Sequence, residues 1–203
     1  MNLPIRFFCI LFSLLLSLPS LGSTEERSSG HWLEDYQDDF ELFSFDGYRI
    51  QRYRSPTPSH SEYAQTLNTE GVISLLDKVP EVVLLDVQPL PWSGEFIHKK
   101  NERRKNIKGS TWLPNVGLGE LELSWSEYYQ KHLERLTNQN KSHPIILYCR
   151  ADCWMSWNAI KRAAEWGYTT LYWYRDGTDA WLESDRKVIV ATPEPFPYRE
   201  KKN

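Results

Sequence analysis

The residues best suited to chemistry are two cysteines, Cys149 and Cys153, which stand four positions apart after the apolar run of residues 143–148. A buried strand that ends there and leads into a helix would leave Cys149 facing backbone N–H groups and the positive end of a helix dipole. Both stabilise a thiolate and lower the pKa of a thiol, so Cys149 is the predicted nucleophile. The predicted active loop adds six neighbours to the two cysteines: Arg150, Ala151, Asp152, Trp154, Met155 and Ser156.

The second thiol leaves several kinds of chemistry open. Cysteines four residues apart on a turn can bring their Cα atoms within the range of about 4.4 to 6.8 Å that a disulfide needs. The pair predicts either a local disulfide or inert thiols, or else redox or sulfur-transfer chemistry. Binding of Cu(I) by Cys149, Cys153 and Met155 is disfavoured, because no histidine lies in the motif. We predict no metal site and no cofactor.

Helical and strand patterns alternate around these cysteines and predict an α/β domain with parallel strands. Helices are expected with Thr69 as one N-cap, with Ser124 or Ser126 as another, and after Cys153, where Gly167 suits the C-terminal end. Apolar runs indicate strands at residues 82–87, 143–148 and 170–174, and residues 107–114 are expected to form a turn that leads into a short strand.

Ligands of open parallel sheets gather at the carboxyl ends of the strands. Asp86, Cys149 and Asp176 all follow predicted strands, so we expect them at one edge. The basic run of residues 99–108 could face an anion, but a solvated loop is favoured. Four tryptophans are also expected near this edge, where core packing is favoured over a partner surface: Trp154, Trp157, Trp173 and Trp181.

The two ends of the chain are expected to lie outside the α/β domain. Residues 1–22 are typical of an export signal, with Arg6 before an apolar run and the small residues Ser20 and Gly22 at the cleavage positions. Residues 23–65 are expected to form an N-terminal extension with a strand or hairpin around Asp46-Gly47, residues 66–192 the α/β domain, and residues 193–203 a flexible tail. Export would place the last two cysteines in an oxidising compartment.

The charge excludes two classes of partner. Without residues 1–22, which contain Arg6 and no acidic residue, 23 basic and 27 acidic side chains are left. A net charge of −4 gives no general attraction to nucleic acid or to anionic lipid. We therefore predict no nucleic acid partner and no membrane contact after the signal is cleaved.

The chain resembles the rhodanese-like domain family from about Thr66 to Leu182. The matching segments are Leu84-Leu-Asp-Val87, Ile107-Lys-Gly-Ser, Ile145-Ile-Leu-Tyr-Cys149, Gly167-Tyr, Asp176-Gly177 and Ala180-Trp181. The resemblance implies a rhodanese-like open parallel sheet flanked by helices, with Cys149 carrying a persulfide. The loop departs from the family, since Asp152, Cys153 and Trp154 stand where a glycine and a basic residue are usual. An inward Asp152 would oppose a thiolate.

A narrower resemblance is to the CXXCW-motif proteins associated with pyrroloquinoline quinone (PQQ)-dependent catabolism. Three segments carry it: Tyr148-Cys-Arg-Ala-Asp-Cys-Trp-Met-Ser-Trp-Asn-Ala159, Trp112-Leu-Pro-Asn115 and Tyr172-Trp-Tyr-Arg-Asp-Gly-Thr-Asp179. It implies a periplasmic accessory protein of alcohol or aldehyde oxidation, with a quinoprotein dehydrogenase or its cytochrome c as partner. Three roles stay open: a sulfurtransferase using Cys149, a dithiol/disulfide couple with Cys153, and a disulfide-pinned scaffold without catalysis.

Overall fold

A parallel sheet of five strands forms the centre of the computed structural model, which describes residues 41–98 and 103–198. The strands lie in the order β1 (Gln65–Leu67), β6 (Leu171–Tyr174), β5 (Ile145–Tyr148), β2 (Val83–Asp86) and β4 (Thr111–Trp112). The predicted α/β fold with an open parallel sheet is confirmed. The predicted export signal, residues 1–22, lies outside the described residues.

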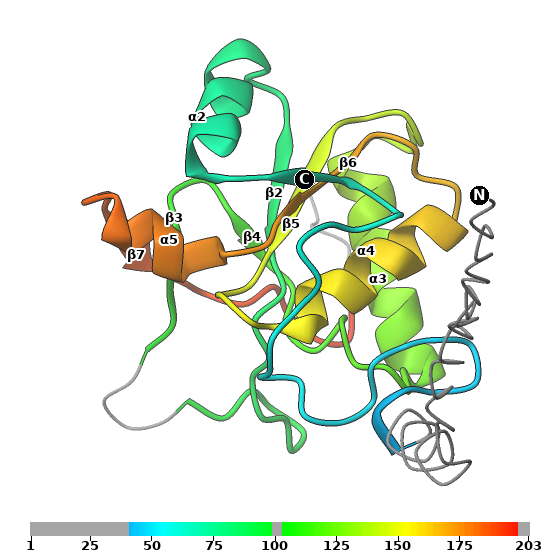
Figure 1. Ribbon diagram of the computed structural model, residues 1–203. Helices are drawn as coiled ribbons and strands as arrows, with labels where there is room; N and C mark the ends of the chain where they lie inside the picture. Colours follow the sequence, from blue (N-terminus) through cyan, green and yellow to red (C-terminus); the bar gives the residue numbers. More distant parts are fainter. Residues whose placement is uncertain (1–40, 99–102, 199–203) are drawn as a thin grey trace, which may run out of the picture.

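Helices cover both faces of the sheet (Figure 1). They are α2 (Thr69–Lys78), α3 (Leu123–Leu136), α4 (Trp154–Glu165) and α5 (Gly177–Glu183). Successive side chains of a strand point to opposite faces. Leu84 and Ile146 therefore pack in the cluster with α2 and α5, whereas Leu85 and Leu147 pack in the cluster with α3 and α4. Because both faces are covered, β2 and β5 are apolar along most of their length.

Two predicted helix caps are wrong. The N-cap of α2 is Asn68, whose side-chain oxygen accepts a hydrogen bond from the Gly71 N–H at 2.9 Å. Thr69 is instead the first helical residue, and its hydroxyl pairs with the Tyr174 hydroxyl. Helix α3 begins at Leu123 without a side-chain cap, so the serines at 124 and 126 lie inside its first turn. The predicted end of α4 is confirmed, because Gly167 follows it with φ +87°.

Several short elements were not predicted. Strands β3 (Lys105–Ile107) and β7 (Val188–Val190) pair antiparallel as a separate two-stranded sheet. Strand β1 lies at one edge of the main sheet, and α5 starts at Gly177, shortly after β6. Among the described segments, no helix is both long and apolar enough to cross a membrane.

The segments that flank the domain are packed against it. Near the N-terminus, a tight turn at Gly47 brings Phe43 and Arg49 into a single antiparallel bridge, which agrees with the expected hairpin. Near the C-terminus, the ring of Phe196 stacks on Trp125 of α3 at 3.7 Å between centroids. Residues 193–198 are thus held against α3, in contrast to the flexible tail expected from residue 193.

Candidate functional site

Cys149 follows β5 at the carboxyl edge of the sheet. In the sheet register, Tyr148 of β5 lies beside Asp86 of β2, and both Asp86 and Cys149 are fully buried. The expectation that these two residues share one edge is confirmed. Asp176 follows β6 at the same edge, but its carboxylate pairs with Arg175 at 2.8 Å. The structure therefore brings Asp86 and Cys149 together, whereas the carboxylate of Asp176 is engaged by Arg175.

Cys149 and Cys153 are joined in a disulfide. Their Cα atoms are 6.2 Å apart, inside the range of about 4.4 to 6.8 Å that disulfides adopt. Cys149 is 0% exposed and Cys153 is 5% exposed. A disulfide holds no thiolate, so the nucleophile predicted at Cys149 exists only after a reductant has opened the bond.

The predicted active loop divides into an exposed turn and a buried helix start. Arg150 and Asp152 are exposed, Ala151 is half-buried, and Trp154, Met155 and Ser156 are buried in the first turn of α4. Because Asp152 is exposed, the repulsion predicted for an inward carboxylate does not arise. Ser156 anchors the loop, since its hydroxyl donates to the Cys153 carbonyl at 3.1 Å and accepts from the Trp173 indole at 3.0 Å.

Arg104 connects three parts of the site. Its Nε and Nη2 donate to the two carboxylate oxygens of Asp86 at 2.8 and 3.1 Å. The same guanidinium donates to the Cys149 carbonyl at 3.0 Å and to the Thr178 hydroxyl at 3.2 Å. Thr178 also donates to the Cys149 carbonyl, through its hydroxyl at 3.2 Å. The end of β2, the start of the cysteine loop and α5 are thereby held together by one side chain.

Burial dominates the electrostatics of Asp86. Removal from water raises the pKa of the Asp86 carboxyl above its ordinary value. The Arg104 guanidinium and the N–H of Gln88, which donates at 3.0 Å, lower the same pKa and offset part of this effect. The charged form of Asp86 in the folded protein therefore depends on Arg104.

Gly177 allows α5 to approach the cysteine loop. Its φ is +50°, and a Cβ at this position would lie 2.6 Å from the Cys149 carbonyl oxygen. The backbone of Gly177 also forms an antiparallel bridge with Arg150. A side chain would therefore be strained here and would push α5 away from the loop.

The N-terminal extension covers the other side of the loop. Arg54 forms an antiparallel bridge with Cys153, and the Trp154 N–H donates to the Tyr53 carbonyl at 2.9 Å. The Ser55 N–H donates to the Asp152 carbonyl at 3.1 Å. Figure 1 shows the extension, in blue and cyan, passing the N-terminal end of α4. One of the helix-start N–H groups that the sequence assigned to the sulfur is thus used by the extension.

A polar side chain stands beside the Cys149 sulfur. Sγ of Cys149 lies 3.1 Å from Oε1 of Gln88, two residues after Asp86. In the reduced protein the thiol can donate to this oxygen, and rotation of the amide lets its NH₂ group donate to a thiolate. Gln88 was not predicted from the sequence as a site residue.

Replacement of Gln88 by leucine is expected to slow the reaction of reduced Cys149 with iodoacetamide at neutral pH by about tenfold, because a hydrogen bond to a charged group is lost. The rate constant follows from mass spectrometry of quenched samples. Gln130→Leu, which removes an amide from α3, serves as the matched control. Equal rates for the two variants would contradict a role for the Gln88 amide at the sulfur.

A pocket of about 340 Å³ opens next to Gln88. It is lined by Gln88, Pro89, Leu90, Pro91, Ile97, Arg103, Arg104, Trp112 and Arg150. Arg103 and Arg104 belong to the basic run of residues 99–108, for which a solvated loop was favoured. Arg104 is turned inward and pairs with the buried Asp86, whereas Arg103, Lys105 and Lys108 are exposed, as the favoured interpretation expects. Residues 99–102 of the run lie outside the described residues.

A family model of the rhodanese-like domain matches residues 62–184. The chain belongs to the rhodanese-like domain family. Cys149, at the end of β5, therefore stands where the sequence resemblance expected the active cysteine of the family. No curated protein compared with the chain matches it significantly.

Solved structures similar to this rhodanese-like protein have low sequence identity. A polysulfide-sulfur transferase homodimer from Wolinella succinogenes is 17% identical, with 63% of this chain and 79% of that chain covered and a TM-score of 0.41. Thiosulfate sulfurtransferase from Pseudomonas aeruginosa is 16% identical, with 64% and 21% covered and a TM-score of 0.44. A rhodanese-like domain from Anabaena sp. is 15% identical, with 68% and 93% covered and a TM-score of 0.41.

The tryptophans near the site pack in the core of the rhodanese-like domain or against it. Trp173 is 0% exposed, and Trp154 and Trp181 are each 7% exposed. Trp157 is half-buried and meets Tyr63 edge to face. The favoured interpretation as core residues is thus confirmed for Trp154, Trp173 and Trp181, which leaves little of these three rings for a partner to contact.

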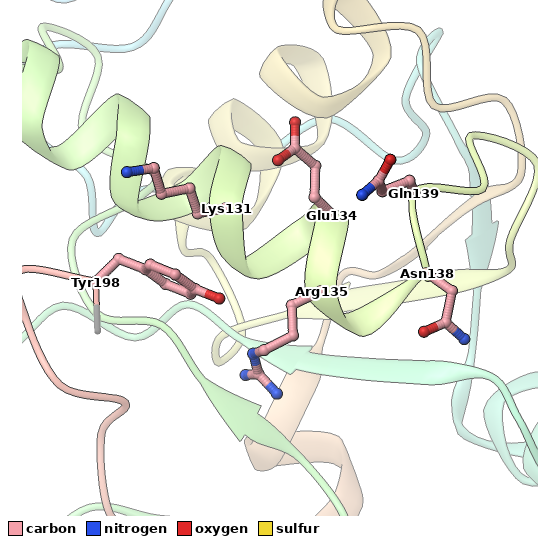
Figure 2. Close-up of a pocket in the computed structure, with 6 residues that line it drawn as sticks. All are labelled: Lys131, Glu134, Arg135, Asn138, Gln139 and Tyr198. Carbon is pink, nitrogen blue, oxygen red and sulfur yellow. The ribbon is translucent and has the colours of Figure 1, made fainter. Parts of the chain in front are cut away.

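A second hollow lies far from the cysteines. Figure 2 shows its lining by Lys131, Glu134, Arg135, Asn138, Gln139 and Tyr198, and its volume is about 700 Å³. It lies at the C-terminal end of α3, which leads to the amino end of β5, whereas Cys149 follows the carboxyl end of that strand. The smaller pocket is lined by Gln88, whose Oε1 lies 3.1 Å from the Cys149 sulfur, so we place the candidate site there. No metal-binding group of three His, Cys, Asp or Glu side chains occurs in the parts of the chain that the structure describes.

Proposed function

We propose that this rhodanese-like protein is an exported, periplasmic accessory of PQQ-dependent alcohol or aldehyde oxidation, in which Cys149 and Cys153 act as a dithiol/disulfide couple. The observation that supports the couple is the bond between the two sulfurs at the end of β5, where the family carries its active cysteine. The link to quinoprotein oxidation is supported by the resemblance of residues 148–159 to the CXXCW-motif proteins. The partner would be a quinoprotein dehydrogenase or its cytochrome c.

Thiol–disulfide exchange between the reduced cysteine pair and a disulfide of the partner takes two steps. The Cys149 thiolate attacks a disulfide of the partner, which forms a mixed disulfide and releases one partner thiolate. The Cys153 thiolate then attacks Sγ of Cys149, which restores the internal disulfide and releases the second partner thiolate. Two electrons pass to the partner. A dithiol protein of the same compartment supplies two electrons to return the pair to its reduced form.

Sulfur transfer is a second candidate, and the pocket with three arginines beside Gln88 favours it. The Cys149 thiolate would take the sulfane sulfur of an anionic donor such as thiosulfate, releasing sulfite and forming a persulfide. Cys153 would then attack Sγ of Cys149 and expel hydrosulfide, which would leave the disulfide and stop turnover. Sustained transfer would need a reductant in each cycle.

The mature protein, purified from the exporting compartment, is expected to resist alkylation of Cys149 and Cys153 until it is reduced. Its intact mass should then gain two alkyl groups after reduction and none before, because both sulfurs are engaged in one bond. A denatured, unreduced sample is the control for burial. Alkylation of one cysteine without reductant, or an extra sulfur atom that reductant removes, would contradict the couple and support the persulfide carrier.

The link to PQQ-dependent oxidation is tested by deletion of the gene for this protein from its source organism. Quinoprotein-dependent alcohol oxidation in whole cells is expected to fall and to return with the native gene but not with Cys149→Ser. Unchanged oxidation in the deletion strain would contradict the accessory role and would leave the thiol chemistry standing.

A further inference from the structure

The pocket beside Cys149 has more positive charge than its own carboxylates balance. Arg104 is paired with Asp86, and Arg54, whose charge acts on Arg150, is paired with Asp179 at 3.4 Å. Among the residues that the structure describes, Arg103 and Arg150 have neither an ion-pair nor a side-chain hydrogen-bond partner, although both line the pocket. Two guanidinium groups are therefore available to an anion.

The surroundings of Arg150 agree with an excess of positive charge in the pocket. Partial removal from water lowers the pKa of the Arg150 guanidinium, and the like charges of Arg54 and Arg104 lower it further, while Asp179 raises it. Repulsion between neighbouring guanidinium groups is relieved when an anion binds between them. Arg side chains present paired N–H donors, a geometry that matches the two oxygens of a carboxylate.

The remaining walls of the pocket are apolar and fixed in place. They are formed by Pro89, Leu90, Pro91, Ile97 and Trp112, and Ile97 is 47% exposed. The backbone N–H of Leu90 donates to the Asn115 side chain at 3.0 Å, and the Asn115 amide donates back to the Leu90 carbonyl at 2.7 Å. The Trp112 indole donates to the Gln88 carbonyl at 2.8 Å. Because these groups are already bonded, the wall is preformed for a flat, apolar ligand surface.

We propose that this pocket binds a planar aromatic polycarboxylate, with carboxylates on Arg103 and Arg150 and the ring system against Leu90 and Ile97. A small inorganic anion would use the arginines and leave the apolar wall wet, whereas a neutral aromatic compound would leave both charges unpaired. Pockets for small organic ligands begin at about 300 Å³, so a volume of about 340 Å³ suits a compact ring system. This inference rests on the proposed function in one respect only: PQQ-dependent oxidation would be the biological source of such a ligand.

The test uses PQQ, itself a planar aromatic tricarboxylate, as the probe. It is titrated into the mature, disulfide-bonded protein, so that no free thiol can add to the quinone, and binding is followed by calorimetry. Saturable binding is expected, and it should weaken between about 50 and about 500 mM salt because screening reduces the ionic contacts. Benzene-1,3,5-tricarboxylate should also bind. Citrate, which has three carboxylates and no ring, and adenosine monophosphate, which has a phosphate in place of carboxylates, should each bind about tenfold more weakly.

Variants locate the site. Arg103→Gln and Arg150→Gln are each expected to weaken PQQ binding by about tenfold or more, since each removes charged hydrogen bonds to a carboxylate. Lys131→Gln removes the same charge from the hollow of Figure 2 and is the matched control, expected to bind as the native protein does. Equal losses in all three variants would show attraction by net charge alone and overturn the proposal.

Other outcomes separate the pocket from the proposed function. The proposed ligand of the pocket is wrong if PQQ shows no saturable binding at millimolar concentration, or if PQQ and citrate bind with equal affinity. Either result leaves the proposed accessory role intact. Binding that requires Arg103 and Arg150 supports the pocket even if cells without the chain oxidise alcohol normally. Normal alcohol oxidation in cells that lack this protein would contradict only the link to quinoprotein oxidation.

Discussion

Replacement of Cys153 by serine is expected to stop exchange with a protein disulfide after a single step. Cys149 can still attack, but no second thiolate lies near enough to resolve the mixed disulfide, so the covalent complex should accumulate. Steady turnover should fall by on the order of a hundredfold or more, as for loss of a reacting group. Non-reducing mass spectrometry after mixing with an oxidised peptide measures both effects.

The same variant distinguishes the couple from sulfur transfer. Cys149→Ser is the matched control and should form no mixed disulfide, since it lacks the attacking sulfur. If Cys153→Ser instead turned over thiosulfate faster than the native protein, sulfur transfer would be the function and the couple would be wrong. Loss of a disulfide that closes so short a loop should lower the free energy of unfolding by about 2 kcal/mol.

Replacement of Arg104 by methionine is expected to lower the free energy of unfolding at neutral pH by about 3 kcal/mol. The carboxylate of Asp86 is fully buried and would lose both hydrogen bonds from the guanidinium. The Cys149 carbonyl would lose a donor at 3.0 Å as well. Urea denaturation of the native protein and the variant measures the difference. Arg103→Met is the matched control, expected to stay within about 0.5 kcal/mol because Arg103 is exposed.

The defect of Arg104→Met should depend on pH. Without Arg104, only the Gln88 N–H opposes the effect of burial on Asp86, so its pKa in the folded state rises further above the ordinary value of 3.8. A group whose pKa is raised by folding favours the folded state below its unfolded pKa, and this contribution is lost as pH rises through the folded pKa. The variant should therefore be closest to the native protein at about pH 4 and furthest from it at about pH 7. A loss that is independent of pH would contradict the ion pair as its cause, and Asp86→Asn combined with Arg104→Met should recover part of the stability.

The central elements of the fold are visible in the sequence because they depend on local patterns. Strands β2 and β5 read as apolar runs because helices cover both of their faces. The end of α4 is marked by Gly167, since only glycine takes a left-handed backbone without cost. The short elements escaped notice because they lack such patterns: β3 and β7 have three residues each and are paired across more than 80 positions of the chain.

The amino-acid sequence by itself determined where the reactive atoms stand, since Cys149 ends a strand and Cys153 follows four residues later. Only the tertiary structure decided the state and the surroundings of these sulfurs. Segments far apart in the chain supply the cover over Cys153 from Arg54, the amide beside Cys149 from Gln88, and the cation on Asp86 from Arg104. Burial and charge pairing depend on which segments meet in space, so no local pattern could have shown that a run of basic residues would turn one arginine inward.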